Sequence, residues 1–390
     1  MTDLPEADWT RRDDLAQLVA VLGPGNARYV GGAVRDTLLG LPVKDIDMAT
    51  PLTPDAVIAR LEAAGIRQVP TGIEHGTVTA ILAGGPVEIT TLRRDVSTDG
   101  RRATVAFAEA WEDDAARRDF TINALYADPV TREVHDWFGG LADLAAGRVR
   151  FIGDAHARIR EDHLRILRYF RFQARFGGHP ADAAAEAACA ELAPTLKGLS
   201  RERVAMELLN LLALPDPAPT VRRMAELGVL PVILPEASPA ALATLIASER
   251  ATGAAPDPLR RLAALLPADP PLVDQVGARL RLSTAQRKRL ATAAARCAGE
   301  DVPHPRALAY RLGLTEARDR LLLAGAPITA LDGWEIPRLP LKGGDIVARG
   351  VGAGPEVARV LRAVEERWIA EGFPDADRVA ALLDEVLAAR

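Results

Sequence analysis

The chain of 390 residues contains only two cysteines, Cys189 and Cys297, which lie far apart in the sequence. So few cysteines exclude a disulfide-stabilised scaffold and a Cys-rich zinc site, and they fit a reducing cytoplasm. No apolar run approaches the roughly 20 residues of a membrane-spanning helix. The first residues, 1–14, are polar and acidic, unlike a secretory signal peptide. We therefore expect a soluble cytoplasmic protein that makes no membrane contact.

The chain also lacks a large excess of basic residues. Its formal net charge is -5, which argues weakly against nucleic-acid binding by the molecule as a whole. Two segments depart from this average. Residues 151–175 hold six arginines and three acidic residues, and residues 275–296 hold six Lys or Arg and no Asp or Glu. Both are expected to be helical, so each presents either a basic stripe for phosphates or an ordinary solvated helix face.

The hydrophobic pattern changes near residue 150. Before it, short β-like runs alternate with helices and with turns that contain glycine or proline. These runs lie at 27–30, 45–49, 78–82, 87–92, 103–107 and 134–136. After residue 150, Leu and Ala recur at three- and four-residue spacings that indicate helices, interrupted by proline-rich breaks. We expect a mixed α/β head followed by an elongated all-α remainder, in two or three domains.

A glycine turn stands at the first β-like run. Gly31 and Gly32 follow residues 28–30 and precede an expected helix at 33–39. Glycines let a ligand approach the backbone closely, and a helix N-terminus favours an anion. Arg35 adds a planar charged fork that suits phosphate. The run lacks the G-x-G-x-x-G spacing of dinucleotide-binding folds, which argues against a Rossmann-type site.

Two carboxylates, Asp45 and Asp47, follow this turn. In a strand, alternate side chains point to the same face, so both acids share one face while Ile46 points into the core. Two acids so close repel each other unless a cation or another partner offsets them. Mg²⁺ prefers one or two carboxylates together with substrate phosphates, so the pair is a candidate magnesium site. Glu88, on a neighbouring expected strand, is either a third carboxylate or a rim acid in an ion pair.

A second group of charged residues begins at Arg117. Arg117, Arg118 and Asp119 precede an apolar run in which Asn123 lies one turn farther on. We expect the two arginines at a helix start, where cations are disfavoured unless an anionic ligand is bound. Arg118 and Asn123 are then placed to reach a triphosphate and its sugar. The preceding segment, 95–102, is polar and contains glycine, and we expect it to be a mobile loop.

The segment 160–172 is expected to be one helix with a polar stripe. Asp162, Arg165, Arg168 and, one step farther round, Arg171 are spaced by three residues. Asp162 and Arg165 offer an acceptor and a planar donor fork, a combination that can read the Watson–Crick edge of a base. The alternative is a plain salt bridge between these two side chains.

Five motifs in this chain occur together and in order. They are Gly31-Gly32-x-Val34-Arg35-Asp36, Asp45-x-Asp47, Arg117-Arg118-Asp119-Phe120-Thr121, Asp136-x-Phe138-Gly139-Gly140-x-x-Asp143-Leu144 and Glu161-Asp162-x-x-Arg165-x-x-Arg168. The set resembles class II tRNA nucleotidyltransferases (CCA-adding enzymes) and the similar bacterial poly(A) polymerases. The resemblance is strong over about residues 27–210. The run from Ser200 to Glu207 is similar to the family's next motif, and residues 344–355 are similar to its weaker C-terminal pattern.

The resemblance implies an α/β nucleotidyltransferase head followed by an all-α neck, body and tail. We expect the head, or palm, at residues 1–150. A helical neck that selects the nucleotide and binds RNA is expected at 151–215, a helical body at 216–333 and a helical tail at 334–390. The implied assembly is a monomer or a homodimer.

The resemblance also implies an activity, which is the template-independent addition of C, C and A from CTP and ATP to the tRNA 3′ end, with release of pyrophosphate. Asp45 and Asp47 are implied as catalytic residues that hold two Mg²⁺ ions. The implied nucleotide-binding residues are Gly32, Arg35, Arg118, Asn123, Asp162, Arg165, Arg168 and Arg171, and the implied supporting residues are Glu161 and Asp119.

Other functions stay open. A poly(A) polymerase or an A-only-adding enzyme shares nearly every head motif, although the acidic, alanine-rich C-terminal region favours tRNA. The segment 95–102 resembles a loop that is shortened in relatives adding only CC, which argues against that activity. A non-catalytic RNA-binding module is a remote alternative, because the carboxylates Asp45 and Asp47 and the pair Asp162 and Arg165 are all present.

Overall fold

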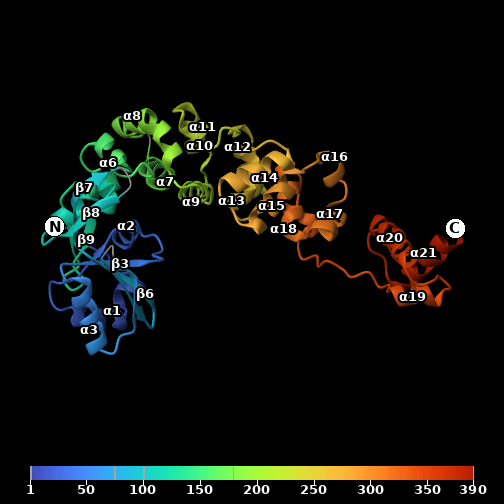
Figure 1. The fold of residues 1–390 in the computed structure, drawn as a ribbon, viewed down its shortest axis with the longest axis horizontal. Helices are drawn as coiled ribbons and strands as arrows, with labels where there is room; N and C mark the ends of the chain where they lie inside the picture. The colour runs from blue at the N-terminus through green and yellow to red at the C-terminus, as the bar shows by residue number, and fades with distance from the viewer. Residues whose placement is uncertain (1, 74–75, 100–101, 179, 390) are drawn as a thin grey trace. The chain divides into compact units, whose positions relative to one another are not determined.

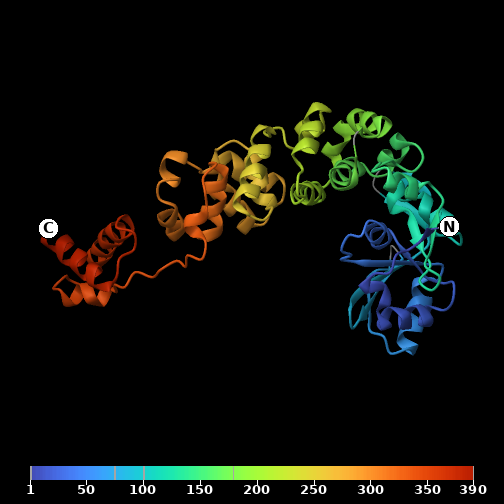
Figure 2. The same ribbon diagram turned by 180° about the vertical axis from the view of Figure 1, so that it is seen from behind.

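The computed structural model describes residues 2–73, 76–99, 102–178 and 180–389. The chain divides into two compact units, an N-terminal unit of Met1–Pro235 and a C-terminal unit of Glu236–Arg390. Figure 1 and Figure 2 trace both from opposite sides. Over the described residues, no helix combines the length and the apolar character needed to cross a membrane. The four-part division expected from the sequence stays a prediction.

The head of the N-terminal unit is built on a mixed sheet. Within the described residues eight strands pair in the order β1-β10-β9-β2-β3-β6-β5-β4. They are β1 (Thr2–Asp3), β2 (Arg28–Val30), β3 (Ile46–Thr50), β4 (Gln68–Gly72), β5 (Thr77–Leu82), β6 (Gly85–Thr91), β9 (Leu125–Ala127) and β10 (Glu133–Asp136). Strand β3 runs parallel to β6 and antiparallel to β2, and in the β3–β6 register Asp47 stands opposite Glu88.

The two faces of this sheet have different roles. Helices α1 (Asp13–Leu22) and α3 (Pro54–Ala63) lie against the sheet (Figure 1). Their leucines enter a core on one face of it, where Met48 and Ile89 are buried. Ala49 belongs to a second cluster on the other face. Because side chains alternate along a strand, Asp47 lies on the same face as Ala49. The sheet therefore keeps its carboxylates off the helix-covered core.

Strands β7 (Arg93–Asp99) and β8 (Arg102–Phe107) form a separate antiparallel hairpin. The expectation of a loop at 95–102 was wrong for most of that segment, and its positions 100–101 lie outside the described residues. A two-stranded ribbon needs no apolar core of its own. The polar sequence of this segment therefore indicated a loop, although backbone pairing makes it part of two strands.

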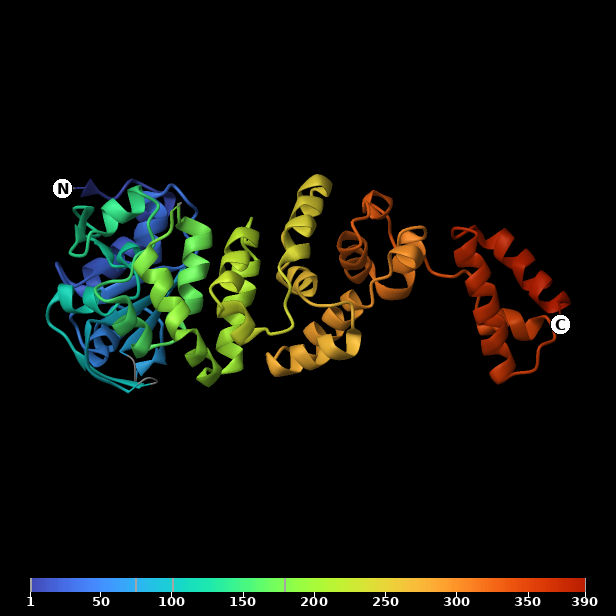
Figure 3. The ribbon, with the colours of Figure 1, turned by 90° about the horizontal axis from the view of Figure 1, so that it is seen from above.

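The remaining helices of the N-terminal unit follow the motifs along the chain. They are α2 (Gly32–Leu38), α4 (Trp111–Ala116), α5 (Gly140–Ala145), α6 (Ala155–Glu161), α7 (Arg165–Phe176), α8 (Ala183–Leu192), α9 (Arg201–Leu212), α10 (Ala218–Glu226) and α11 (Val229–Ile233), with 3-10 turns η1 (Asp8–Arg11), η3 (Thr121–Asn123) and η4 (Ala193–Gly198). Helices α7 and α9 lie side by side (Figure 3).

The expected single helix at 160–172 is interrupted. Helix α6 ends at Glu161, and Asp162 has an extended backbone with φ -149° and ψ 105°. Its carboxylate accepts a hydrogen bond from the backbone N–H of Leu164 at 3.1 Å. An Asp that bonds its own neighbouring backbone competes with helix formation, so Asp162 lies between two helices.

The C-terminal unit is helical. Its helices are α12 (Ala240–Thr252), α13 (Pro258–Leu265), α14 (Pro270–Arg279), α15 (Thr284–Ala294), α16 (Ala298–Asp301), α17 (Pro305–Leu312), α18 (Leu314–Leu323), α19 (Gly343–Ala348), α20 (Pro355–Ala370) and α21 (Ala376–Ala388), with the 3-10 turn η5 (Thr329–Leu331). One apolar cluster joins residues of α12, α13, α17 and α18, and a second joins α19, α20 and α21. The expected all-α character is confirmed.

Buried ion pairs brace the helices of the C-terminal unit. Glu249 is buried and accepts from Arg260 and Arg261 at 2.8 Å each. Asp319, also buried, pairs with Arg260 at 3.3 Å and with Arg289 at 2.7 Å. Buried charges are tolerated only when they are paired in this way.

Arginines of the basic segment 275–296 therefore form ion pairs within the unit. Besides Arg289, Arg279 pairs with Glu236 at 2.6 Å, and Arg287 pairs with Asp274 at 2.6 Å. For these three arginines the structure supports intramolecular ion pairing rather than a free basic stripe.

Helix α5 lies in close contact with the 3-10 turn η3. The Asp136 carboxylate accepts backbone hydrogen bonds from Gly140 and Leu141 at 2.9 Å each. Asp143 accepts from the Thr121 hydroxyl at 2.6 Å. A Cβ atom added at Gly140 would overlap the carbonyl oxygen of Thr121. The motif that contains these acids thus holds the turn that carries Asn123.

We predict that Gly140→Ala lowers the free energy of unfolding by about 1–3 kcal/mol, because the backbone must shift to relieve this overlap. Gly198→Ala is the matched control, since a Cβ atom there meets open space. Urea denaturation of both variants measures the difference. Equal stability of the two variants would contradict the close approach at Gly140.

Candidate active site

A polar cleft of about 580 Å³ lies in the N-terminal unit. Its lining residues are Gly31, Gly32, Arg35, Asp45, Asp47, Arg117, Arg118, Asp119, Asn123, Asp162, Arg165, Arg168, Arg171 and Phe172. Most of the residues selected from the sequence are thus brought to one place, although they come from distant parts of the chain. Glu88 and Glu161 are not among the lining residues.

The glycine turn is shaped by a close approach. Gly31 has φ +68°, a backbone conformation that L side chains rarely adopt. A Cβ atom there would lie 3.3 Å from Nη1 of Arg118. Helix α2 begins at Gly32, which confirms the predicted turn-to-helix transition. The absence of side chains leaves room for the Arg118 guanidinium at this edge of the cleft.

Arg35 is buried beside this turn. Its guanidinium pairs with Asp36 at 2.7 Å and donates from Nη1 to the side-chain oxygen of Asn123. It also lies 4.2 Å from the ring centroid of Phe176. Burial lowers the pKa of Arg35, and the nearby Asp36 carboxylate opposes this shift. Arg35 therefore holds its neighbours in place as well as lining the cleft.

Asn123 links Arg35 to helix α7 through Asp119. Its side-chain nitrogen donates to Oδ1 of Asp119 at 2.9 Å, and Oδ2 of Asp119 accepts from Nε of Arg168 at 2.7 Å. Burial raises the pKa of Asp119, but the hydrogen bonds and the Arg168 charge outweigh it and leave this pKa below its usual value. The carboxylate of Asp119 stays ionised and anchors both partners.

The carboxylate pair stands at the start of strand β3. Asp45 is exposed and precedes the strand, while Asp47 lies within it and is half-buried. Burial raises the pKa of Asp47, Glu88 and Asp45 raise it further, and Arg118 opposes them. Such mutual repulsion is what a bound cation would relieve.

The donor set suits a hard divalent cation. Asp45 and Asp47 offer carboxylate oxygens on one side of an otherwise arginine-rich cleft. Among the described residues, no group of three or more His, Cys, Asp or Glu side chains is placed to hold a metal. Two protein carboxylates leave most coordination positions to phosphate oxygens and water, as Mg²⁺ commonly requires. Glu88 stays a prediction as a third ligand.

Arg117 and Arg118 end a helix rather than begin one, contrary to expectation. Helix α4 stops at Ala116, and Arg117 is its C-cap residue. Cations are favoured at a helix C-terminus, so the local backbone accepts both arginines without a bound anion. The apolar run after them is a 3-10 turn and a strand, which the periodicity did not distinguish from a helix.

The side chains of Asp162 and Arg165 are each paired with another residue, and the two residues bond each other through the backbone alone among the described contacts. Asp162 pairs with Arg203 of helix α9 at 2.7 Å. Arg165 pairs with Glu161 at 2.5 Å and donates to the backbone carbonyl of Arg117 at 3.0 Å. Among the described contacts, the plain salt bridge considered from the sequence is replaced by these two separate pairs. Both side chains line the cleft.

Arg168 and Arg171 share a partner that sequence spacing did not indicate. Glu207 of α9 is buried and pairs with Arg171 at 2.6 Å and with Arg168 at 3.8 Å. Phe172 was also missed, and its ring lies under the guanidinium groups of Arg168 and Arg171 at 5.4 and 4.8 Å. The signal for Glu207 was its place in the next helical motif, since α9 packs along α7.

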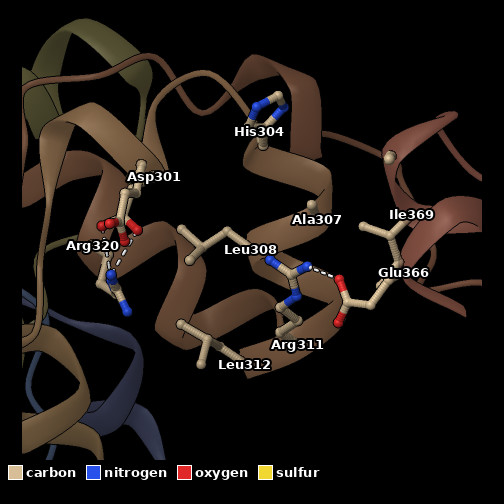
Figure 4. A pocket seen from close by; sticks show the side chains of 11 residues that line it. Asp301, His304, Ala307, Leu308, Arg311, Leu312, Arg320, Glu366 and Ile369 are labelled. Atoms are coloured by element: carbon tan, nitrogen blue, oxygen red, sulfur yellow. Dashed lines mark hydrogen bonds and ion pairs between the residues drawn. The ribbon is translucent and has the colours of Figure 1, made fainter. Parts of the chain in front are cut away.

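A second pocket, of about 420 Å³, lies in the C-terminal unit (Figure 4). Its charged groups are largely paired, Asp301 with Arg320 at 2.6 Å and Arg311 with Glu366 at 2.7 Å. It contains none of the residues predicted for chemistry. The cleft in the N-terminal unit is therefore the candidate active site.

Paired carboxylates on a mixed sheet, next to an arginine-lined polar cleft, are the features of a nucleotidyltransferase. Residues 27–150 match the family described as "Poly A polymerase head domain". Residues 182–241 match the family described as "Probable RNA and SrmB- binding site of polymerase A".

The chain is similar to proteins with this chemistry over most of its length. It is 35% identical to the mitochondrial CCA tRNA nucleotidyltransferase 1 of Mus musculus, over 89% of this chain and 83% of that protein. It is 40% identical to the CCA-adding enzyme of Geobacillus thermodenitrificans, over 52% of this chain and 49% of that enzyme. The crystal structure of the Bacillus stearothermophilus CCA-adding enzyme in complex with CTP superposes with a TM-score of 0.73, at 27% identity over 96% and 98% of the two chains.

The chain belongs to the family of class II CCA-adding tRNA nucleotidyltransferases and poly(A) polymerases. It is an enzyme of the nucleotidyltransferase type, and enzymes of this family generally use a divalent metal. The predicted fold class and family are confirmed.

We predict that Asp47→Asn raises the melting temperature by about 1–3 °C when divalent metal is absent. A carboxyl with a raised pKa binds its proton more tightly in the folded protein than in the unfolded chain. Its contribution to the free energy of unfolding therefore falls as the pH rises above 3.8, the usual pKa of an aspartate. At pH 7 the amide removes this unfavourable charge.

Thermal denaturation in EDTA tests the prediction. Asp45→Asn is the control and should change the melting temperature less, because solvent screens the exposed Asp45 carboxylate. An Asp47→Asn protein that melts at or below the wild-type temperature would contradict it.

Proposed function

We propose that this enzyme adds C, C and A from CTP and ATP to the tRNA 3′ end without a nucleic-acid template and releases pyrophosphate. One observation carries the proposal. A single cleft combines the carboxylates of Asp45 and Asp47, the guanidinium of Arg118, and an acceptor and a donor fork in Asp162 and Arg165. The named activity of the relatives, including the mouse enzyme similar over most of both chains, supports the choice of substrate.

We propose Mg²⁺ as the divalent metal, with Asp45 and Asp47 as its protein ligands. When bound, Mg²⁺ lowers the pKa of the attacking 3′-hydroxyl and neutralises charge on the triphosphate. The protein itself contributes positioning and fixed charge, which are the main requirements of phosphoryl-type transfer.

The arginines on the head side would hold the triphosphate. The Arg118 guanidinium lies beside the side-chain-free Gly31, so a phosphate can approach it along the backbone of the turn at Gly32. Arg35 and Asn123 fix the position of this turn through their hydrogen bond. These residues orient the phosphate chain so that the leaving pyrophosphate faces away from the incoming hydroxyl.

Asp162 and Arg165 would select the base. Cytosine and adenine both present an exocyclic amine donor next to a ring-nitrogen acceptor, whereas uracil and guanine present a carbonyl at the position of that amine. A carboxylate that accepts and a guanidinium that donates therefore match C and A and reject U and G. We propose Arg168 and Arg171 as their support, because Glu207 and Asp119 hold both side chains near the cleft.

We further propose the division into a head at 1–150, a neck at 151–215, a body at 216–333 and a tail at 334–390. The family matches at 27–150 and 182–241 support the first two parts. We infer a reducing compartment, the cytoplasm, because the described Cys189 and Cys297 both carry free thiols.

One assay tests the substrate and the product. Three tRNAs, one without the CCA end, one lacking only the final A and one intact, are incubated with CTP, with ATP and with both. We expect completion of each shortened end and no extension of the intact one. Addition confined to the final A, or a long A tail, would instead support the A-only enzyme or the poly(A) polymerase.

We predict that Asp45→Ala and Asp47→Ala each lower the rate of nucleotide addition by about 100- to 1000-fold while tRNA affinity changes less than about threefold, since charge stabilisation at the reacting phosphate is lost. Single-turnover incorporation and filter binding measure the two effects. Glu109→Ala, at an exposed acid outside the lining of the cleft, is the control. Near-normal addition by either variant would overturn the metal-ligand assignment.

We predict that Arg165→Ala reduces the preference for CTP and ATP over UTP and GTP by about 10- to 100-fold, the value of one bidentate base contact. Competition assays with all four nucleotides give the ratios of kcat/KM. Arg160→Ala, at an exposed arginine two residues before the interruption at Asp162, should leave them unchanged. Unaltered selectivity in Arg165→Ala would restrict Arg165 to a structural role.

A further inference from the structure

Asp114 makes a set of contacts that none of the family motifs discussed above accounts for. It lies on α4 and is 2% exposed. Its Oδ2 accepts from the Tyr126 hydroxyl at 2.5 Å and from Nη2 of Arg118 at 3.2 Å. Its Oδ1 accepts from the backbone N–H of Arg93 at 3.2 Å. One buried carboxylate thus contacts Arg118 just beyond its own helix and two strands, β7 through Arg93 and β9 through Tyr126.

Tyr126 closes this arrangement around Arg118. Its hydroxyl donates to Asp114 and accepts from Nε of Arg118 at 2.9 Å. The Arg118 guanidinium also lies 5.2 Å from the Tyr126 ring centroid. The Nε and Nη2 edge of the guanidinium is therefore held by two oxygen atoms. Nη1 is left on the side of Gly31, which is the side of the cleft.

Asp114 is negatively charged, which suits a residue that holds the Arg118 guanidinium. Burial raises the pKa of Asp114, but Arg118, the Tyr126 hydroxyl, Arg117 and the Arg93 amide together outweigh burial and lower it. The group is anionic at neutral pH, and its hydrogen bonds to a cation and to a hydroxyl are of the strong, charge-assisted kind.

The third contact reaches the hairpin. Arg93 is the first residue of β7 and pairs in register with Phe107, the last residue of β8. Its N–H is thus at the base of the β7–β8 ribbon. A displacement of this base is felt at Oδ1 of Asp114, while Oδ2 holds Arg118.

We propose that Asp114 and Tyr126 are positioning residues for Arg118, and that Asp114 couples the base of the β7–β8 hairpin to the grip on the triphosphate. The proposal rests on the proposed function, in which Arg118 binds the phosphates. It assigns to the hairpin a direct mechanical connection to the nucleotide site.

The first experiment measures nucleotide binding. Tyr126→Phe removes only the hydroxyl and should raise KM for CTP and ATP, and the dissociation constant of CTP, about five- to tenfold, the value of one lost hydrogen bond. KM for tRNA and the melting temperature should change little. Tyr169→Phe is the matched control, because the Tyr169 hydroxyl is buried and has no hydrogen-bond partner among the described residues.

A double-mutant cycle shows whether Tyr126 acts through Arg118. In an Arg118→Ala background, adding Tyr126→Phe should change the CTP dissociation constant less than twofold. An equal loss in both backgrounds, or an unchanged constant in the single Tyr126→Phe variant, overturns the positioning role. CTP binding is measured without tRNA by calorimetry, so this result stands apart from a failure of CCA addition by the wild-type enzyme, which would instead overturn the proposed function.

The hairpin connection has its own readout. Asp114→Asn should accelerate amide hydrogen exchange in β7 and β8, because the Arg93 N–H then has a weaker acceptor, whereas Tyr126→Phe should leave exchange there at the wild-type rate. Asp113→Asn, at the exposed neighbouring acid, is the control. Wild-type exchange in Asp114→Asn, or equal acceleration in both variants, overturns the coupling.

Discussion

The cleft depends on one buried carboxylate, Asp119, which joins the head to helix α7. Its Oδ1 accepts from the backbone of Phe120 at 2.8 Å and from the side chain of Asn123. Its Oδ2 accepts from Arg168, which lies 49 residues away along the chain. Breaking such a buried pair from one side leaves an uncompensated charge, which typically costs about 3–5 kcal/mol. Because Asn123 in turn bonds Arg35, the glycine turn is held by the same carboxylate.

Carboxylate partners explain how the cleft can hold so many arginines when no ligand is bound. Arg118, Arg165, Arg168 and Arg171 each have a carboxylate partner within the N-terminal unit. The partners fix the guanidinium groups before a nucleotide arrives, so little rearrangement is needed when charge develops during reaction. The negative charges of Asp45 and Asp47, in contrast, repel each other. This is where a cation would bind.

Much of this arrangement could be predicted from the sequence, and the reasons for the rest are physical. Strands β2, β3, β5, β6, β8 and β10 follow from alternating apolar residues between turn signals, and the buried Ile46 follows from strand periodicity. Strand β7 did not follow, because its own sequence, Arg93–Asp99, is almost wholly polar and carries no apolar alternation. The interruption at Asp162 did not follow either, since spacing by three fits a helix whether or not the carboxylate bonds its own backbone. The roles of Glu207 and Arg203 as partners were not predicted, because the residues they pair with lie on a distant segment of the chain. Spacing along one segment does not encode a contact between two segments.

The orientation of Arg165 has a further consequence, because its hydrogen bonds include main-chain oxygens. It donates to the carbonyls of Arg158 at 2.9 Å and Arg117 at 3.0 Å, and Arg158 in turn donates to the carbonyl of Ala116 at 3.0 Å. Every residue type supplies a carbonyl, so these acceptors persist whichever side chains occupy positions 116, 117 and 158. A substitution at position 117 or 158 therefore leaves the main-chain oxygen that holds the Arg165 guanidinium in place, whatever else the new side chain changes.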